Sequence, residues 1–489
     1  MALHGKTAAR PSAPKRLDTR SEQYLILVYT VVSGFFTHYL QGIATMATVL
    51  PPGPYRNIPL ADGQSVPYYI IPFDKKGACV GPATRAHLIE SARAGGFTDI
   101  VVFSHGWNND WSVATGRYEH FLKGYMDMRS AHDLPMPAGY KPMLVGVFWP
   151  STALVFGEDE KGPAIAAGDP DAMDQAVAEQ LEEVATLAEE LNADDAERLY
   201  DLAQKAALDP NEALELAEIL KQIYAAPEDE LGDDAPPTAQ ALVDVWMQAQ
   251  ATPDDLDDFG TVNDAGSDGP QAAFIGGLLK KLDPRPVIRV ATVYKMKDRA
   301  GTVGARGVGS LLRDLLAACD ARVHLIGHSY GGKIVLSATA AEPLPRPVES
   351  MLLLQPAVSH LCFADQVPGT DRAGGYRSVL QRVKKPILST FSSHDFPLTK
   401  TFHLALRRGK DLGEARIAGA EPPSVYAALG GFGPRGCGER LIDIHALNSA
   451  YDLDPEVPIY GLRGDAAISS HGDISNEVTW WALYSLLSR

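Results

Sequence analysis

The sequence has very little cysteine, and its few cysteines lie far apart. The chain of 489 residues contains four of them, Cys79, Cys319, Cys362 and Cys437. None of the spacings is typical of a zinc or iron–sulfur site, and a chain of this length does not depend on a disulfide framework. The sequence therefore predicts free thiols and gives no indication of a metal centre.

The sequence also lacks an excess of basic residues. It has 44 lysines and arginines against 61 aspartates and glutamates, which gives a formal net charge of −17. Such a charge argues against nucleic acid or anionic membrane surfaces as general partners. With 45% apolar residues and no internal repeat, the chain is globular. It is long enough for one large core with a sizeable insertion, or for two domains.

Only one long stretch lacks charge, and it lies near the N-terminus. After a basic lead, no charge occurs between Glu22 and Arg56. Residues 24–42 are apolar enough for an uncleaved signal anchor, although their polar residues and Gly34 weaken a membrane-spanning helix. A core strand and an extension outside the domain are two other interpretations. The sequence leaves all three interpretations open, and it leaves the location of the protein open as well. We therefore treat residues 1–50 as a segment separate from the core domain.

Most of the chain alternates between strand-like and helix-like segments. This pattern predicts an α/β fold with a mostly parallel sheet and helices on both faces. Strands are expected at 66–73, 99–104, 142–149, 322–327, 350–355, 386–393 and 440–447, the last of which would close the sheet. Helices are expected at 83–93, 113–129, 303–318 and 474–487, the last as an amphipathic closing helix.

The alternation stops between residues 151 and 284, where the sequence is acidic and rich in alanine. Helical spacing of Leu216, Ile219, Leu220 and Ile223, and a capping signal at 209–212, predict a helical insertion. It divides the core into residues 51–150 and 285–489. Loops at the carboxyl ends of parallel strands face the site in such folds, so we expect the insertion to act as a lid. A surface decoration is the alternative.

The stretch Gly327-His328-Ser329-Tyr330-Gly331 joins an apolar strand to a helix. A tight turn there strains the backbone of Ser329 toward a positive φ, and Gly327 and Gly331 avoid a collision across the turn. The serine hydroxyl would then lie over a helix N-terminus, which favours developing negative charge. This pattern is a G-x-S-x-G nucleophile elbow, and Ser329 is the predicted nucleophile.

A second segment, His105-Gly106-Trp107, follows the strand at 99–104. Gly106 would let the backbone approach the nucleophile. The Trp107 and Tyr330 backbone N–H groups are then the expected pair of oxyanion donors. We expect His105 to brace this loop rather than to react.

The general base is expected to be a histidine after the last strand, and the acid a carboxylate between the nucleophile and that histidine. His471, just before the closing helix, fits the base, with His445 as the alternative. Asp395, which follows the strand at 386–393, fits the acid, with Asp365 as the alternative.

With Ser329, Asp395 and His471 in this order, the sequence resembles the α/β-hydrolase superfamily over residues 66–150 and 286–489. The resemblance rests on the segments HGWNND, GHSYGG, SSHD and SSHGDIS. It implies a doubly wound sheet of about eight strands with a Ser-His-Asp triad. The long insertion and the N-terminal segment depart from the family pattern and leave the substrate class open.

We therefore expect an enzyme that hydrolyses carboxylic esters of small molecules through an acyl-enzyme, with no metal or organic cofactor. A peptidase, amidase or thioesterase would use the same residues. A non-catalytic binding protein on the same fold is the alternative from another class, because fold does not fix function.

Overall fold

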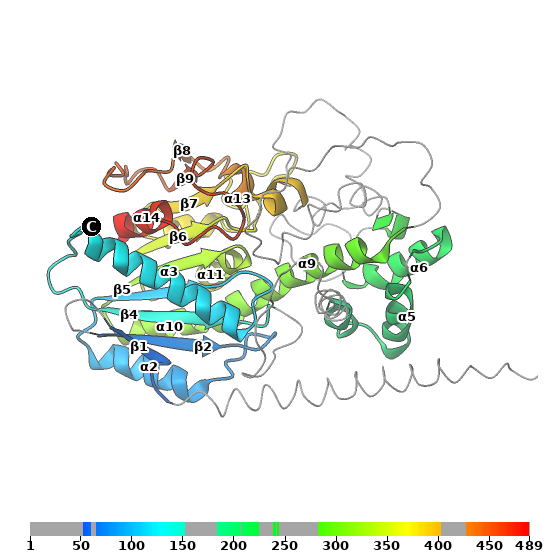
Figure 1. Cartoon of the computed structure of the whole chain (residues 1–489), viewed down its shortest axis with the longest axis horizontal. Coiled ribbons are helices and arrows are strands. Elements are labelled where there is room, and N and C mark those ends of the chain that lie inside the picture. Colours follow the sequence, from blue (N-terminus) through cyan, green and yellow to red (C-terminus); the bar gives the residue numbers. More distant parts are fainter. Residues whose placement is uncertain are drawn as a thin grey trace, which may run out of the picture.

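A computed structural model describes residues 52–59, 65–151, 183–205, 207–223, 238–240, 242–243, 282–401 and 427–488. Figure 1 shows a central sheet with helices packed around it. The strands are β1 (Arg56–Pro59), β2 (Ser65–Pro72), β3 (Asp99–Ser104), β4 (Pro142–Phe148), β5 (Arg322–His328), β6 (Ser350–Leu354), β7 (Ile387–Phe391), β8 (Arg440–Asp443) and β9 (Ile459–Arg463). The longer helices are α2 (Pro82–Ala94), α3 (Trp111–Ala131), α5 (Ala193–Ala203), α6 (Pro210–Lys221), α9 (Pro284–Thr302), α10 (Gly309–Ala318), α11 (Tyr330–Ala340) and α14 (Glu477–Leu487).

The nine strands of the described residues form one sheet in the order β1-β2-β4-β3-β5-β6-β7-β9-β8. Strand β1 pairs antiparallel with β2, and the other pairings are parallel. The prediction of an α/β class with a mostly parallel sheet is therefore confirmed. Since the strand order reverses direction around β3 and β5, the carboxyl ends of these strands border the crevice where such sheets place their sites.

Two apolar clusters cover the two faces of this sheet. Along β3, Val102 belongs to the cluster with α2, α10 and α11, whereas Val101 and Phe103 belong to the cluster with α3 and α14. Successive side chains of a strand point to opposite faces, so both faces of β3 are buried. This explains why its sequence is a continuous apolar run rather than an alternating one.

Several expectations about the elements need correction. The helix expected at 303–318 is the end of a longer one, in which α9 continues through a π-helical turn (η2, Val303–Val308) into α10. The strand at 440–447 was expected to be the last in the chain, but β8 ends at Asp443, is a half-exposed edge strand and is followed by β9. Strand β9, which the sequence analysis missed, inserts between β7 and β8.

The closing helix α14 is not amphipathic. Residues 481–487 are all buried. The reason is that α14 lies in the same cluster as α3 and the sheet, while the loop before β9 covers it. In that loop the carbonyl of Ser449 accepts a hydrogen bond of 2.7 Å from Trp481 Nε1.

The insertion is described in part. A helical stretch at 183–188 and helices α5 and α6 lie within it, and the predicted capping box of Asp209 and Glu212 at the start of α6 is confirmed. Residues 216, 219, 220 and 223 are buried. In Figure 1, α5 and α6 lie beside the far end of α9, beyond the sheet. The acidic stretches at 228–237 and 251–270 lie outside the described residues.

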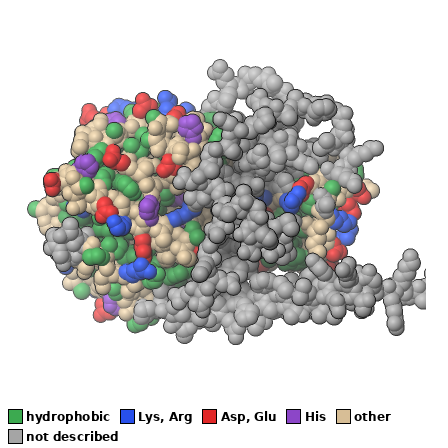
Figure 2. All heavy atoms as spheres, in the orientation of Figure 1, with side chains coloured by type: hydrophobic (Ala, Val, Ile, Leu, Met, Phe, Trp, Pro, Cys, Tyr) green, Lys and Arg blue, Asp and Glu red, His purple; other side chains and the backbone are tan. Residues whose placement is uncertain are grey.

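The distribution of surface charges and the state of the cysteines can be compared with the composition. Figure 2 shows one face of the molecule, and acidic and basic side chains are mixed over the described part of it. The four cysteines are free, with Cys362 and Cys437 buried and the other two half-buried. None of the described helices is long and apolar enough to cross a membrane. The apolar stretch 24–42 lies outside the described residues.

Candidate active site

Ser329 lies on the sharp turn between β5 and α11. Its φ is +54° and its ψ is −124°, so the predicted positive φ is confirmed. A Cβ on Gly327 would lie 2.6 Å from the Gly331 carbonyl oxygen, and one on Gly331 would lie 2.1 Å from the Ser104 oxygen. Neither distance leaves room for a side chain, so this turn can form only with glycine at both positions.

Ser329, His471 and Asp395 lie in one hydrogen-bonded chain at the carboxyl ends of β5, β9 and β7. The Ser329 Oγ lies 2.8 Å from His471 Nε2, and His471 Nδ1 lies 2.8 Å from Asp395 Oδ2. All three residues are buried, with exposed fractions of 2%, 6% and 0% in the same order. The structure thus brings together the three residues that the sequence analysis selected, from positions up to 142 residues apart.

The hydrogen-bond partners determine which nitrogen of His471 carries the proton. An ionised carboxylate can only accept, so His471 Nδ1 donates to Asp395. The neutral ring then presents Nε2 as the acceptor for the Ser329 hydroxyl. The other carboxylate oxygen, Oδ1, accepts from the Leu398 backbone N–H at 3.1 Å, which fixes the carboxylate plane.

The alternative residues lie elsewhere. His445 was expected within the strand at 440–447, but it lies in a half-exposed loop after β8, stacked on Tyr451 at 4.2 Å between ring centres. Its Nδ1 donates to the carbonyls of Ser449 and Ala450. Asp365 is 65% exposed and forms an ion pair with Arg377. Neither alternative forms part of the chain around Ser329.

The loop after β3 is held by His105. Its ring Nδ1 donates to the Gly106 carbonyl at 2.8 Å, and its Nε2 accepts from the Trp149 backbone N–H at 3.3 Å. The His105 carbonyl accepts from the indole Nε1 of Trp149 at 2.9 Å. Burial lowers the pKa of His105 to about 3, so the ring stays neutral and keeps these two roles. His105 therefore braces the loop.

This loop passes directly against the nucleophile. A Cβ on Gly106 would lie 2.9 Å from the Ser329 Cβ, so only glycine fits there. Trp107 follows Gly106, and Tyr330 is the first residue of α11. Their backbone N–H groups thus belong to the two segments that meet at Ser329, while donation to an oxyanion stays a prediction.

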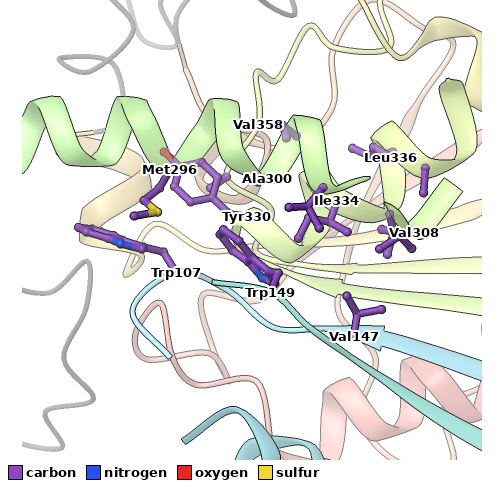
Figure 3. Packing of buried hydrophobic residues seen from close by; sticks show 14 of the residues in the cluster. Trp107, Val147, Trp149, Met296, Ala300, Val308, Tyr330, Ile334, Leu336 and Val358 are labelled. Atoms are coloured by element: carbon purple, nitrogen blue, oxygen red, sulfur yellow. The ribbon is translucent and has the colours of Figure 1, made fainter. Parts of the chain in front are cut away.

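Apolar side chains gather beside this point. In Figure 3, Trp107 lies next to Met296, and the ring of Tyr330 lies between α9 and Trp149. The Tyr330 hydroxyl donates to the Val293 carbonyl in α9 at 2.9 Å. Helix α9, which follows the insertion, is therefore tied to the residue after the nucleophile.

Sequence reasoning missed two polar residues of the site, His328 and Gln355. His328 ends β5, and its Nε2 lies 2.9 Å from the backbone oxygen of His471. Gln355 follows β6, with a φ of +42°, and its Nε2 lies 3.4 Å from Asp395 Oδ2. The available signal was a polar residue at the carboxyl end of each of two neighbouring apolar strands.

Comparisons of the chain with known protein families, curated proteins and solved structures found no match. Within the described ranges, no group of three or more histidine, cysteine, aspartate or glutamate side chains is placed to hold a metal ion.

Proposed function

We propose that the protein is a serine hydrolase that cleaves carboxylic esters through an acyl-enzyme. The observation that carries this proposal is the hydrogen-bonded chain from Ser329 through His471 to Asp395, with both distances at 2.8 Å. A serine hydroxyl is a weak nucleophile, and an adjacent base that is oriented by a carboxylate is the arrangement that activates it.

The reaction would proceed in two halves. The Ser329 Oγ attacks the carbonyl carbon while His471 Nε2 takes its proton, and Asp395 stabilises the imidazolium that forms. His471 then gives this proton to the leaving alcohol. In the second half it activates the water that hydrolyses the acyl-enzyme. The Trp107 and Tyr330 N–H groups would hold the oxyanion, and each such donor is typically worth about 3–4 kcal/mol of transition-state stabilisation.

We also propose that the sheet belongs to the α/β-hydrolase fold and that residues 151–284 act as a lid. The support for the fold is the parallel sheet with the serine on a strand-to-helix turn. The support for the lid is the contact of α5 with α9, together with the hydrogen bond from Tyr330 to α9. A shift of the insertion could thus reach the site through one helix.

The function is tested with a fluorophosphonate probe, which reacts with activated serines. We expect covalent labelling at Ser329, located by peptide mass spectrometry, and none in Ser329→Ala. A folded wild-type protein that is not labelled would instead be the binding protein named as the alternative. A panel of p-nitrophenyl esters of increasing chain length, with an anilide and a thioester as controls, separates an esterase from an amidase or thioesterase.

The lid is tested by replacing residues 152–281 with a short linker. A lid limits access more than chemistry, so KM and the preference between short and long esters should change while labelling of Ser329 by a small fluorophosphonate continues. An unchanged preference in a folded variant would show that the insertion is a surface decoration.

A further inference from the structure

We propose that Gln355 and His328 are positioning residues that together clamp the backbone carbonyl of His471 and thereby hold its ring between Ser329 and Asp395. This inference rests on the proposed function, since it concerns the geometry of the proposed base.

The backbone carbonyl of His471 is the point that the clamp holds. It accepts one hydrogen bond from His328 Nε2 at 2.9 Å and another from Gln355 Nε2 at 3.2 Å. The two donors come from the ends of β5 and β6, which are neighbours in the sheet. His471 itself lies in a loop, eight residues beyond the end of β9. These hydrogen bonds therefore hold His471 in a fixed position relative to β5 and β6, two strands at the centre of the sheet.

Gln355 makes two further contacts, and the one with Asp395 links the base to the acid. Besides the His471 carbonyl, its amide nitrogen faces the Ser470 carbonyl at 2.7 Å and Asp395 Oδ2 at 3.4 Å. All three surrounding oxygens are acceptors, so only the NH₂ end of the amide can face them. One side chain thus contacts both the carboxylate and the loop of the histidine that this carboxylate orients.

The local structure of Gln355 is costly, which indicates a specific role. The residue is fully buried, has a φ of +42°, and its Oε1 is buried without a hydrogen-bond partner among the described residues. Its backbone N–H is fixed by Thr390 Oγ1 at 3.0 Å. Strain and an unsatisfied acceptor of this kind persist where the surrounding structure and function require them.

His328 can keep the proton on its Nε2, and with it the hydrogen bond to the His471 carbonyl, throughout a reaction cycle. A carbonyl only accepts, so the His328 proton is on Nε2. Burial, and next the charge of His471, hold the pKa of His328 well below its usual value. The ring therefore stays neutral when His471 takes up a proton, and it adds no positive charge beside the imidazolium.

The experiment measures the rate of fluorophosphonate labelling of Ser329 against pH. In Gln355→Met, which removes the donors at similar size, we expect the labelling rate to fall about 10- to 100-fold, since a displacement of about 1 Å has that effect. In Gln355→Glu the added carboxylate lies beside Asp395. We expect a similar loss together with a rise of at least about one pH unit in the inflection of the profile.

His328 provides a matched pair of variants. His328→Leu removes the donor, whereas the amide of His328→Gln can place a nitrogen near the position of Nε2. We expect the first to lose about 10-fold or more in labelling rate and the second to recover most of it. His324→Gln is the control. His324 is similarly buried on the same strand, but it lies near the other end of β5 and forms hydrogen bonds with Asp99 and Ser350. Its labelling rate per folded molecule should equal that of the wild type.

The outcomes separate the two proposals. A wild-type protein that does not label at Ser329 would overturn the proposed function, whatever the variants do. If the wild type labels, and the Gln355 variants label at its rate with its pH profile, the clamp is overturned. Should the Gln355 variants fail to fold, the comparison of His328→Leu with His328→Gln decides, and equal wild-type rates in both would overturn the clamp.

Discussion

Ser329 occupies a backbone conformation that few residues other than glycine adopt. A strained φ of this kind costs about 1–3 kcal/mol and persists only where neighbours enforce it. Here the Ser329 N–H donates to the Leu354 carbonyl at 3.1 Å, and its own carbonyl accepts from Ala357 at 3.1 Å. The residue is therefore fixed by β6 and by the loop that follows, so its side chain can change without loss of the turn.

We therefore expect Ser329→Ala to fold normally and to lose about 10⁴–10⁶-fold in kcat, since the members of such a chain act as a unit. His471→Ala should lose about as much. His445→Ala should keep its activity, because its half-exposed ring stacks on Tyr451 in the loop after β8 and forms no part of the chain around Ser329. Initial rates with a p-nitrophenyl ester, per folded molecule, measure this. An inactive His445→Ala beside an active His471→Ala would show that the base is assigned wrongly.

Asp395 permits a sharper test, because its side chain can be neutralised at constant size. Asp395→Asn should lower kcat by up to about 10⁴-fold with an unchanged near-UV circular dichroism spectrum, since an amide supports the wrong tautomer of His471. Asp365→Asn is the matched control and should be fully active, as that carboxylate lies on the surface beside Arg377. The reverse result would move the acid to the loop after β6.

At the scale of elements, what the sequence could predict was local. The elbow was predictable because the glycines that it needs lie two residues from Ser329. Strands β3 and β5 were predictable because both faces of each are buried, which makes their sequences largely apolar runs. Strand β9 was missed, because a run of five residues with Gly461 in its middle carries little periodicity. The contacts of Gln355 with residues 395, 470 and 471 depend on how the sheet is assembled, and no local pattern encodes them.

Ion pairs join the insertion to the core along α9. Glu189 pairs with Lys75 at 2.6 Å and with Arg299 at 3.5 Å, and the Arg299 side chain is only 4% exposed. Arg299 also donates to the carbonyl of Pro150 at 3.1 Å, where the chain leaves β4. Two further pairs along the same helices are Arg289–Glu183 and Lys295–Glu190. Burial alone would raise the pKa of Glu190, but the hydrogen bond and charge of Lys295, with the charges of Lys75 and Arg299, outweigh it and lower this pKa.

Glu189→Gln should weaken this attachment, because it leaves the buried Arg299 without its carboxylate. We expect a loss of about 1–3 kcal/mol in the free energy of unfolding and faster proteolysis within residues 183–223. Glu218→Gln is the control, since its pair with Lys221 is more exposed and should contribute little. Urea titrations and limited proteolysis of both variants measure the difference. Equal stability of the two would show that the ion pairs do not hold the insertion.

For the whole molecule, the two-faced sheet buries histidines as well as apolar residues. His105, His324 and His328 are each at most 3% exposed, and they connect β3, β5 and the loops at their ends. Burial is the largest cause that lowers the pKa of each of them, to about 3 for His105. Asp99 opposes this at His324 by accepting a hydrogen bond of 2.8 Å from its Nε2. The folded protein therefore keeps all three rings neutral at neutral pH.

This burial predicts how stability depends on pH. The folded-state pKa of each ring lies below the unfolded value of about 6.5, so below that pH the unfolded chain binds protons that the folded chain does not. The stabilisation is complete above about pH 7. As the pH falls below about 6, His105 should remove about 1.4 kcal/mol of unfolding free energy per pH unit, down to about pH 3, and His324 and His328 should add to this loss in the same direction. Urea unfolding at pH 7.5, 6.5 and 5.5 measures this slope. His324→Gln, which lacks one of these groups, should show a smaller slope. A wild-type unfolding free energy that stays constant between pH 6.5 and 5.5 would mean that these rings take up protons in the folded protein, and the neutral state assigned to His328 in the clamp would then be wrong.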